Sequence, residues 1–194
     1  MRKKLVAGNW KMHGSLQQNA ALLEQLKVGI AKVQCDVAVC VPYPFLAQVR
    51  SVLAGTRLLW GAQSVSEHEL GAFTGEVSAA MLREFGCCYV LVGHSERRSL
   101  FGESDALVAA KFVAAQKAGL VPILCLGESL AERKAGQTRA VVSRQLRAVI
   151  DVAGIAALMS AVVAYEPVWA IGTGVTASPA QAQEVHAAIR AQVG

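Results

Sequence analysis

The chain has 194 residues, of which 54% are hydrophobic and 17% are charged, so it carries enough apolar side chains to bury one sizeable core. Its formal net charge of +5 comes from scattered basic residues, without the cluster that nucleic-acid binding usually shows. The sequence contains no apolar run of about 18 residues and no apolar segment of a signal peptide. We therefore expect a globular, cytoplasmic protein that binds neither nucleic acid nor membrane.

Short apolar runs without polar alternation recur along the chain, as in parallel strands that are covered on both faces. They lie at residues 5–8, 37–41, 58–62, 89–92, 121–126 and 162–165. Between them lie amphipathic stretches with helical spacing of the apolar residues, such as 16–26, 105–118 and 138–150. This alternation predicts an α/β fold in a single domain over residues 1–194. By itself it leaves open a doubly wound sheet and a barrel.

Two helix starts are visible in the sequence. Ser178 as N-cap, Pro179 at the first helical position and Gln181 three residues after the cap predict a capping box. Ser95 as N-cap with Glu96 in the first turn predicts a short helix that begins beside His94.

The cysteines form no C-x-x-C pair, and most of them lie in apolar stretches. Their odd number argues against a disulfide framework, and free cysteine behaves as a small buried hydrophobe. We expect reduced core residues at Cys35, Cys40, Cys87, Cys88 and Cys125.

Functional side chains of α/β proteins collect in the loops that follow the strands. Asn9 and Lys11 follow the first expected strand, His94 and Ser95 follow the fourth, and Glu166 follows the sixth. An amide, a cation, an imidazole and a carboxylate in such loops suit proton transfer next to a carbonyl group. A structural or solvent-exposed role is the simpler interpretation of the other histidines, His13, His68 and His186.

Two familiar patterns match only superficially. The glycines of Gly172-x-Gly174 stand several residues beyond their strand, so we discount a nicotinamide cofactor. The segment from Gly93 to Arg97 lacks the final glycine of a hydrolase nucleophile elbow. Ser95 is therefore not expected to act as a nucleophile.

Three segments resemble sequence motifs of the triosephosphate isomerase family, in the family's order and spacing. They are A-G-N-W-K-M at residues 7–12, G-H-S-E-R-R at 93–98 and A-Y-E-P-V-W-A-I-G-T-G at 164–174. The resemblance implies a (β/α)8 TIM barrel. It also implies an isomerase that interconverts dihydroxyacetone phosphate and glyceraldehyde 3-phosphate through an enediolate, in glycolysis and gluconeogenesis, with no metal and no organic cofactor.

The resemblance implies a role for each candidate residue. Glu166 would remove the proton from the carbon beside the carbonyl, and His94 would donate a hydrogen bond to the oxygen that becomes negative. Lys11 and Asn9 would bind substrate and stabilise that charge. Ser95 would also contribute to substrate binding.

The segment after Glu166 resembles the family's closing lid. A proline entry, an apolar patch and a glycine exit suit a lid that shuts water out from a reactive enediolate. The backbone N–H of Gly172 would then bind the phosphate. The lid would consist of Pro167, Val168, Trp169, Ala170, Ile171, Gly172, Thr173 and Gly174.

The loop after the third expected strand resembles the family's interdigitating dimer loop. Its tip, with Thr74, Gly75 and Glu76, would dock beside Lys11 of a partner subunit. The resemblance thus implies a homodimer.

The chain departs from the family in its length. A barrel of this kind has eight strand-helix units and typically about 250 residues, whereas we count about six units here. We therefore expect a C-terminally incomplete barrel with open edges on its first and sixth strands and little activity by itself. Glu128, which follows the fifth expected strand, is most simply interpreted as a solvated carboxylate.

Two alternative functions stay open. One is a catalytically inactive, truncated barrel that acts only as a dimerising or interaction protein. The other is a different phosphate-binding barrel enzyme, such as an aldolase with Lys11 as Schiff base, which requires a lysine of lowered pKa in an apolar pocket.

Overall fold

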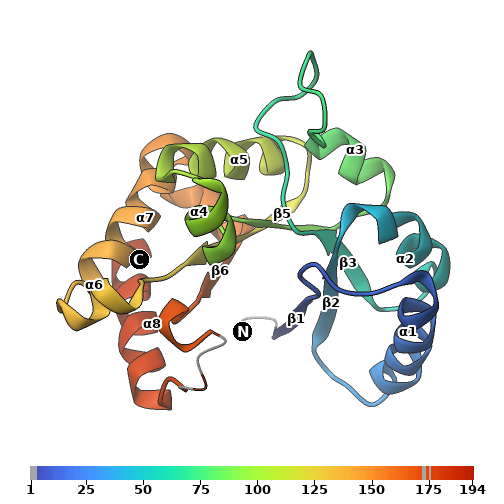
Figure 1. Cartoon of the computed structure of the whole chain (residues 1–194), viewed down its shortest axis with the longest axis horizontal. Coiled ribbons are helices and arrows are strands. Elements are labelled where there is room, and N and C mark those ends of the chain that lie inside the picture. Colours follow the sequence, from blue (N-terminus) through green and yellow to red (C-terminus); the bar gives the residue numbers. More distant parts are fainter. Residues whose placement is uncertain (1–3, 172–173, 175) are drawn as a thin grey trace. The chain divides into compact units, whose positions relative to one another are not determined.

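The computed structural model describes residues 4–171, 174 and 176–194 (Figure 1). The chain divides into two compact units. Unit 1 comprises Met1–Leu91 and Ala114–Val121, and unit 2 comprises Val92–Val113 and Pro122–Gly194. The paired strands in each unit run parallel.

Unit 1 is built on parallel strands that neighbour one another in chain order. Leu5 is in register with Asp36, and Ala38 is in register with Leu59. The strand β2 (Asp36–Val41) is buried along most of its length, as its continuous apolar sequence predicts. The strands are β1 (Leu5–Asn9), β2 (Asp36–Val41), β3 (Leu59–Ala62) and β4 (Tyr89–Val92), whose last residue falls in unit 2.

Two helices of unit 1, α1 (Leu16–Ile30) and α3 (Ala79–Glu84), begin at serine caps. The Ser15 side chain accepts a hydrogen bond from Gln18 N at the start of α1, and α1 contacts α2. Leu23, Val49 and Leu53 are fully buried. The helices are α1 (Leu16–Ile30), η1 (Tyr43–Phe45, a 3-10 helix), α2 (Leu46–Leu53) and α3 (Ala79–Glu84).

Unit 2 contains the parallel pair β5 and β6, in which Ile123 is in register with Val162. Helices α7 and α8 contact each other along their buried faces (Figure 1). The elements are α4 (Ser95–Phe101), α5 (Asp105–Lys117, shared with unit 1), β5 (Val121–Leu126, whose first residue belongs to unit 1), α6 (Leu130–Lys134), α7 (Thr138–Ala153), η2 (Ile155–Ser160), β6 (Val162–Tyr165), η3 (Val168–Ala170) and α8 (Pro179–Val193).

The six expected strands are all present, and three of them have the expected bounds. The capping box of α8 is confirmed, because Ser178 Oγ accepts from Gln181 N and Gln181 Oε1 accepts from Ser178 N. Helix α1 runs on to Ile30, beyond the expected stretch, because Ile30 is buried in the core. Among the described strands, β1 pairs only with β2, and its Val6 is 57% exposed.

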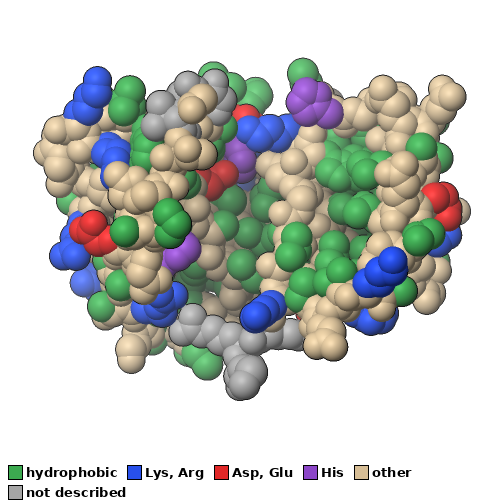
Figure 2. Space-filling view, turned by 90° about the horizontal axis from the view of Figure 1, so that it is seen from below, with side chains coloured by type: hydrophobic (Ala, Val, Ile, Leu, Met, Phe, Trp, Pro, Cys, Tyr) green, Lys and Arg blue, Asp and Glu red, His purple; other side chains and the backbone are tan. Residues whose placement is uncertain are grey.

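The expectation that the cysteines are reduced core residues is confirmed for three of the five and is wrong for Cys35 and Cys88, which are not fully buried. Cys40, Cys87 and Cys125 are buried, Cys35 and Cys88 are half-buried, and all five are free thiols. Burial raises the pKa of Cys40 and Cys87 to about 12. Figure 2 shows Lys and Arg side chains scattered among neutral and apolar ones on the face it presents. In the described ranges, no helix is both long and apolar enough to cross a membrane.

Candidate active site

The centre of the site in unit 2 is a contact between a carboxylate and an imidazole. Glu166 follows β6, and its backbone N–H donates to the carbonyl of Leu126 at the end of β5, at 2.7 Å. Its side chain reaches His94, with 2.9 Å between Glu166 Oε1 and His94 Nε2. The other carboxylate oxygen accepts the backbone N–H of Ser95 at 3.0 Å. The structure thus brings together three of the predicted site residues.

His94, not Ser95, is the N-cap of α4, so the predicted cap is wrong by one residue. The Nδ1 atom of His94 accepts the backbone N–H of Glu96 at 3.3 Å, so the ring nitrogen takes the place of the side-chain oxygen of a common N-cap residue. An accepting Nδ1 carries no proton, so in the neutral ring the proton lies on Nε2 and faces Glu166. Ser95 becomes the first residue of the helix, and its N–H is available to the carboxylate.

The surroundings of Glu166 favour its ionised form. Burial alone raises the pKa of this carboxyl, but the hydrogen bond with His94, the charge of that ring and the N–H of Ser95 together lower the pKa below its ordinary value. The Glu166 side chain is 17% exposed, and that of His94 is 8% exposed. At neutral pH the site therefore presents a carboxylate, which is the state that a general base requires.

Arg98 holds the turn that carries His94. Its Nε donates to the carbonyl of Gly93 at 2.7 Å, and its Nη1 donates to Asp105 at the start of α5, also at 2.7 Å. Gly93 has a φ of +70°, and a Cβ atom there would lie 2.8 Å from Val108 and Arg98. The turn therefore requires glycine, and the hydrogen bonds of Arg98 hold the turn in place.

Glu128 is fully buried, so the expectation of a solvated carboxylate is wrong. The hydroxyl of Tyr165 lies 3.0 Å from both Glu128 oxygens, and Trp169 Nε1 donates to Oε1 at 3.0 Å. Arg133 adds an ion pair at 3.1 Å, and Thr138 adds a hydroxyl at 3.3 Å. Burial and the neighbouring Glu128 raise the pKa of Tyr165 to about 12. These donors come from separate elements, so no local sequence pattern revealed the cluster.

The predicted lid is described in part. Pro167 leads into η3, the side chain of Trp169 is buried against Glu128, and Ile171 is 37% exposed. Gly174 has a φ of +75°, which glycine adopts without strain. Gly172, predicted to bind phosphate, and Thr173 lie outside the described residues.

Asn9 and Lys11 belong to unit 1, where they follow β1. Lys11 has a φ of +51°, a left-handed conformation that is strained for a residue with a side chain. Its backbone N–H donates to Asn9 Oδ1 at 2.9 Å. Gln63 Nε2 donates to the carbonyls of Lys11, at 2.9 Å, and of Cys40, at 3.0 Å. Strain of this kind persists only where its surroundings hold it, and it concentrates at functional sites. No sequence motif indicated this role for Gln63.

The predicted dimer loop is exposed over residues 68–76, including Thr74, Gly75 and Glu76 at its tip. It extends away from the helices of that unit between β3 and α3 (Figure 1). A backbone hydrogen bond of 2.9 Å from Ser66 to Val77 closes its base.

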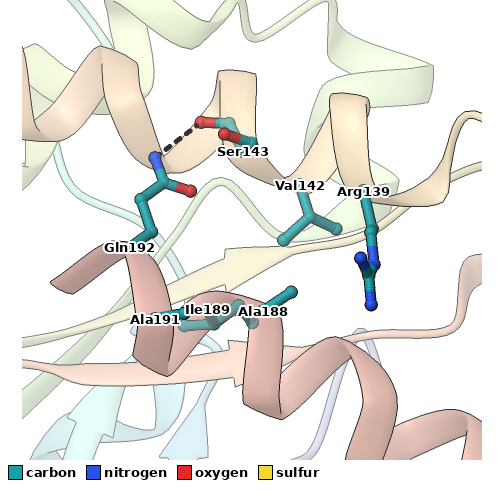
Figure 3. Close-up of a pocket in the computed structure, with 7 residues that line it drawn as sticks. All are labelled: Arg139, Val142, Ser143, Ala188, Ile189, Ala191 and Gln192. Atoms are coloured by element: carbon teal, nitrogen blue, oxygen red, sulfur yellow. Dashed lines mark hydrogen bonds between the residues drawn. The ribbon is translucent and has the colours of Figure 1, made fainter. Parts of the chain in front are cut away.

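Two further features lie outside this site. In the part of the chain that the structure describes, no three His, Cys, Asp or Glu residues form a group suited to a metal ion. A groove between α7 and α8 holds none of the predicted site residues, and Gln192 donates there to the carbonyl of Ser143 (Figure 3). Its lining consists of Arg139, Val142, Ser143, Ala188, Ile189, Ala191 and Gln192.

The matching family model and the relatives named below share one description. A family model described as Triosephosphate isomerase matches residues 4–194. The triosephosphate isomerase of Dechloromonas aromatica is 74% identical over 193 residues, which cover 100% of this chain and 78% of the relative. That of Thiobacillus denitrificans is 71% identical, covering 100% and 77%. That of Bordetella pertussis is 60% identical over 189 residues, covering 97% and 76%.

Proposed function

Because this chain belongs to the triosephosphate isomerase family, we propose that Glu166 and His94 interconvert dihydroxyacetone phosphate and D-glyceraldehyde 3-phosphate by proton transfer. The observation that carries the assignment of these roles is their direct contact of 2.9 Å in a largely buried position. The lowered pKa of Glu166 gives this carboxyl the ionised form that a general base requires.

Glu166 is the base of this proposal. A carboxylate with a lowered pKa is ionised at neutral pH and can take the proton from the carbon beside the substrate carbonyl. With substrate bound, the carboxylate exchanges its hydrogen bond from Ser95 for the carbon-bound proton. The hydroxyl proton on the first carbon then passes to the oxygen of the second carbon, and the same carboxyl returns its proton to the second carbon, which converts ketose to aldose.

His94 is the electrophile. The N–H on Nε2, which faces Glu166 in the free protein, donates to the substrate oxygen as that oxygen becomes negative. Because Nδ1 is occupied by the N–H of Glu96, the ring is held in the tautomer that this donation needs.

Lys11 and Asn9 complete the charge stabilisation in this proposal. The cation of Lys11 offsets the negative charge of the phosphate and the enediolate, and its strained backbone is held by Asn9 and Gln63. Ser95 and Gly172 bind substrate through backbone N–H groups. The lid from Pro167 to Gly174 excludes water, which protects the enediolate from losing its phosphate.

The proposal extends to the assembly and location of the chain. It includes one barrel domain, a cytoplasmic location and a homodimer in which Thr74, Gly75 and Glu76 contact the partner subunit. The exposure of that loop tip supports the dimer, as does Phe73, a large apolar side chain that is 42% exposed. No metal or organic cofactor takes part in the reaction.

The experiment follows deuterium entering dihydroxyacetone phosphate in D2O by proton NMR, which reports proton removal directly. Glu166→Gln keeps the acceptor for Ser95 N–H but removes the base, so exchange falls by a factor of about 10² to 10⁴. The matched control is Glu184→Gln on the exposed side of α8, whose surface ion pair with Arg139 contributes little.

Three results would count against the proposal. Undiminished exchange in Glu166→Gln eliminates the assigned base. A folded parent chain that catalyses no exchange but dimerises favours the alternative of an inactive truncated barrel. A substrate adduct trapped on Lys11 by borohydride favours an aldolase.

A further inference from the structure

Gln145 is a buried polar side chain in α7 that has no role in the proposed mechanism. It is 6% exposed. Its Oε1 accepts the backbone N–H of Gly127 at 2.9 Å, and its Nε2 donates to the carbonyl of the same residue at 3.1 Å. One amide thus pairs with both polar groups of one residue, and a flipped amide would lose both hydrogen bonds.

Gly127 connects this amide to the backbone of the proposed base. A Cβ atom on Gly127 would lie 2.0 Å from the carbonyl oxygen of Glu166 and 3.0 Å from its carbonyl carbon. The preceding residue, Leu126, accepts the N–H of Glu166 at 2.7 Å. The end of β5 therefore contacts both the N–H and the carbonyl group of Glu166. Because this contact is close-packed, a displacement of Gly127 displaces Glu166 too.

The helix that carries Gln145 is packed into the core by its apolar side chains. Its neighbours Val142, Leu146 and Val149 are at most 2% exposed, so the amide is presented from a packed element of regular structure. The Glu166 carboxylate contacts His94 Nε2 at 2.9 Å and the backbone N–H of Ser95 at 3.0 Å, and both contacts depend on the position of the Glu166 backbone. Catalytic groups need placement to within about 0.5 Å.

We propose that Gln145 is a positioning residue for Glu166: by fixing Gly127, it keeps the Glu166 carboxylate in line with His94 and Ser95. This inference rests on the proposed function of Glu166 as the base. Gln145 acts only through Gly127 and is not a catalytic residue.

A purely structural role makes a different prediction. If Gln145 only satisfies the buried polar groups of Gly127, its loss lowers the stability of the fold and leaves the surroundings of Glu166 unchanged. A test must therefore measure the ionisation of Glu166 itself. The δ-carbon of Glu166 does so by 13C NMR, since its chemical shift follows ionisation, and Glu166→Gln identifies the resonance by removing it.

The key variant is Gln145→Met, which keeps the length of the side chain and removes both hydrogen bonds. The matched control is Val149→Ala on the same helix, which loses core packing without touching Gly127. We expect the titration midpoint of Glu166 to rise by about half a pH unit in Gln145→Met, because weakened donation from His94 and Ser95 raises the pKa. In Val149→Ala the midpoint stays at the value of the parent.

Gln145→Asn covers the case in which Gln145→Met does not fold. Its amide is one methylene shorter and reaches at most one of the two Gly127 groups, so its midpoint also rises. Unchanged midpoints in the folded variants would overturn the inference.

Turnover separates failure of this inference from failure of the proposed function. In an active parent, Gln145→Met lowers kcat by a factor of about 10 to 100 and leaves KM nearly unchanged, as expected for a base displaced by a fraction of an ångström. A raised midpoint in a chain without turnover upholds the positioning role and refutes the function. Normal turnover with an unmoved midpoint refutes the positioning role alone.

Discussion

The imidazole of His94 and the carboxylate of Glu166 face each other in one compact unit, with 2.9 Å between Nε2 and Oε1. They come from different parts of the unit, because His94 is the N-cap of α4 and Glu166 follows β6. The carboxylate also receives the N–H of Ser95. Two donors aimed at one buried carboxylate outweigh the cost of burial, so the pKa of Glu166 is lowered.

This lowered pKa predicts how stability depends on pH. The folded carboxyl has a pKa below the unfolded value of about 4.3, so its contribution to the free energy of unfolding is present above that pH. The contribution is lost as the pH falls through the folded pKa. Urea unfolding between pH 3 and 7 should show the advantage of the parent over Glu166→Gln shrinking toward low pH. An advantage that stays constant across this range would contradict the assigned titration.

Much of the fold could be predicted because each buried strand is a continuous apolar run. β4, β5 and β6 have the predicted bounds, since polar residues or glycine follow each run directly. The helices were harder. α2 and α3 contain eight and six residues, too few for the three- and four-residue spacing to repeat convincingly.

The site could be predicted in its residue types and only partly in its contacts. Motif resemblance indicated His94 and Glu166, which the structure brings together. It did not indicate that the His94 ring itself caps α4, because serine is the commoner cap and stands next to it. The burial of Glu128 was missed because its donors, among them Tyr165 and Trp169, are distant in sequence.

Gly127→Ala tests the close approach at the end of β5. The added methyl group would lie 2.0 Å from the Glu166 carbonyl oxygen, which is backbone and cannot rotate away. We expect a loss of about 1 to 3 kcal/mol in the free energy of unfolding, from overpacking. The control is Gly29→Ala in α1, where the methyl group meets nothing within 4 Å and should stabilise by about 0.5 to 1 kcal/mol. Equal effects at both positions would refute the contact.

Trp169→Phe and Tyr165→Phe test the cluster around Glu128. Each variant removes a hydrogen bond to a buried carboxylate, which is worth about 1.5 to 3 kcal/mol of stability. Because both donors share one acceptor, the double variant should depart from additivity by about 0.5 kcal/mol or more. Trp60→Phe is the control, since Trp60 Nε1 donates to the neutral carbonyl of Phe85. Additive losses, with Trp60→Phe as costly as Trp169→Phe, would mean that only packing matters.

Tyr165→Phe also bears on alkaline stability. Burial and Glu128 raise the pKa of Tyr165 to about 12, so the folded state holds this proton more tightly than the unfolded chain does. The resulting stability is fully present below the unfolded pKa of about 10 and is lost as the pH rises toward the folded value. Ultraviolet titration should show a late tyrosine ionisation, and Tyr165→Phe should remove the contribution of this residue. If every tyrosine of the parent ionises near pH 10, the raised pKa is wrong.

Ser178→Ala tests the capping box that the sequence predicted for α8. The variant removes the oxygen that accepts Gln181 N at 3.2 Å, while the reciprocal bond from the backbone N–H of residue 178 to Gln181 Oε1, at 2.9 Å, can persist. We expect a loss of about 1 kcal/mol in the free energy of unfolding, because one N–H of the first turn is left to water. Gln183→Ala, on an exposed turn of the same helix, should change stability by less than about 0.5 kcal/mol. A Ser178→Ala variant as stable as Gln183→Ala would show that Pro179 alone is enough to start the helix.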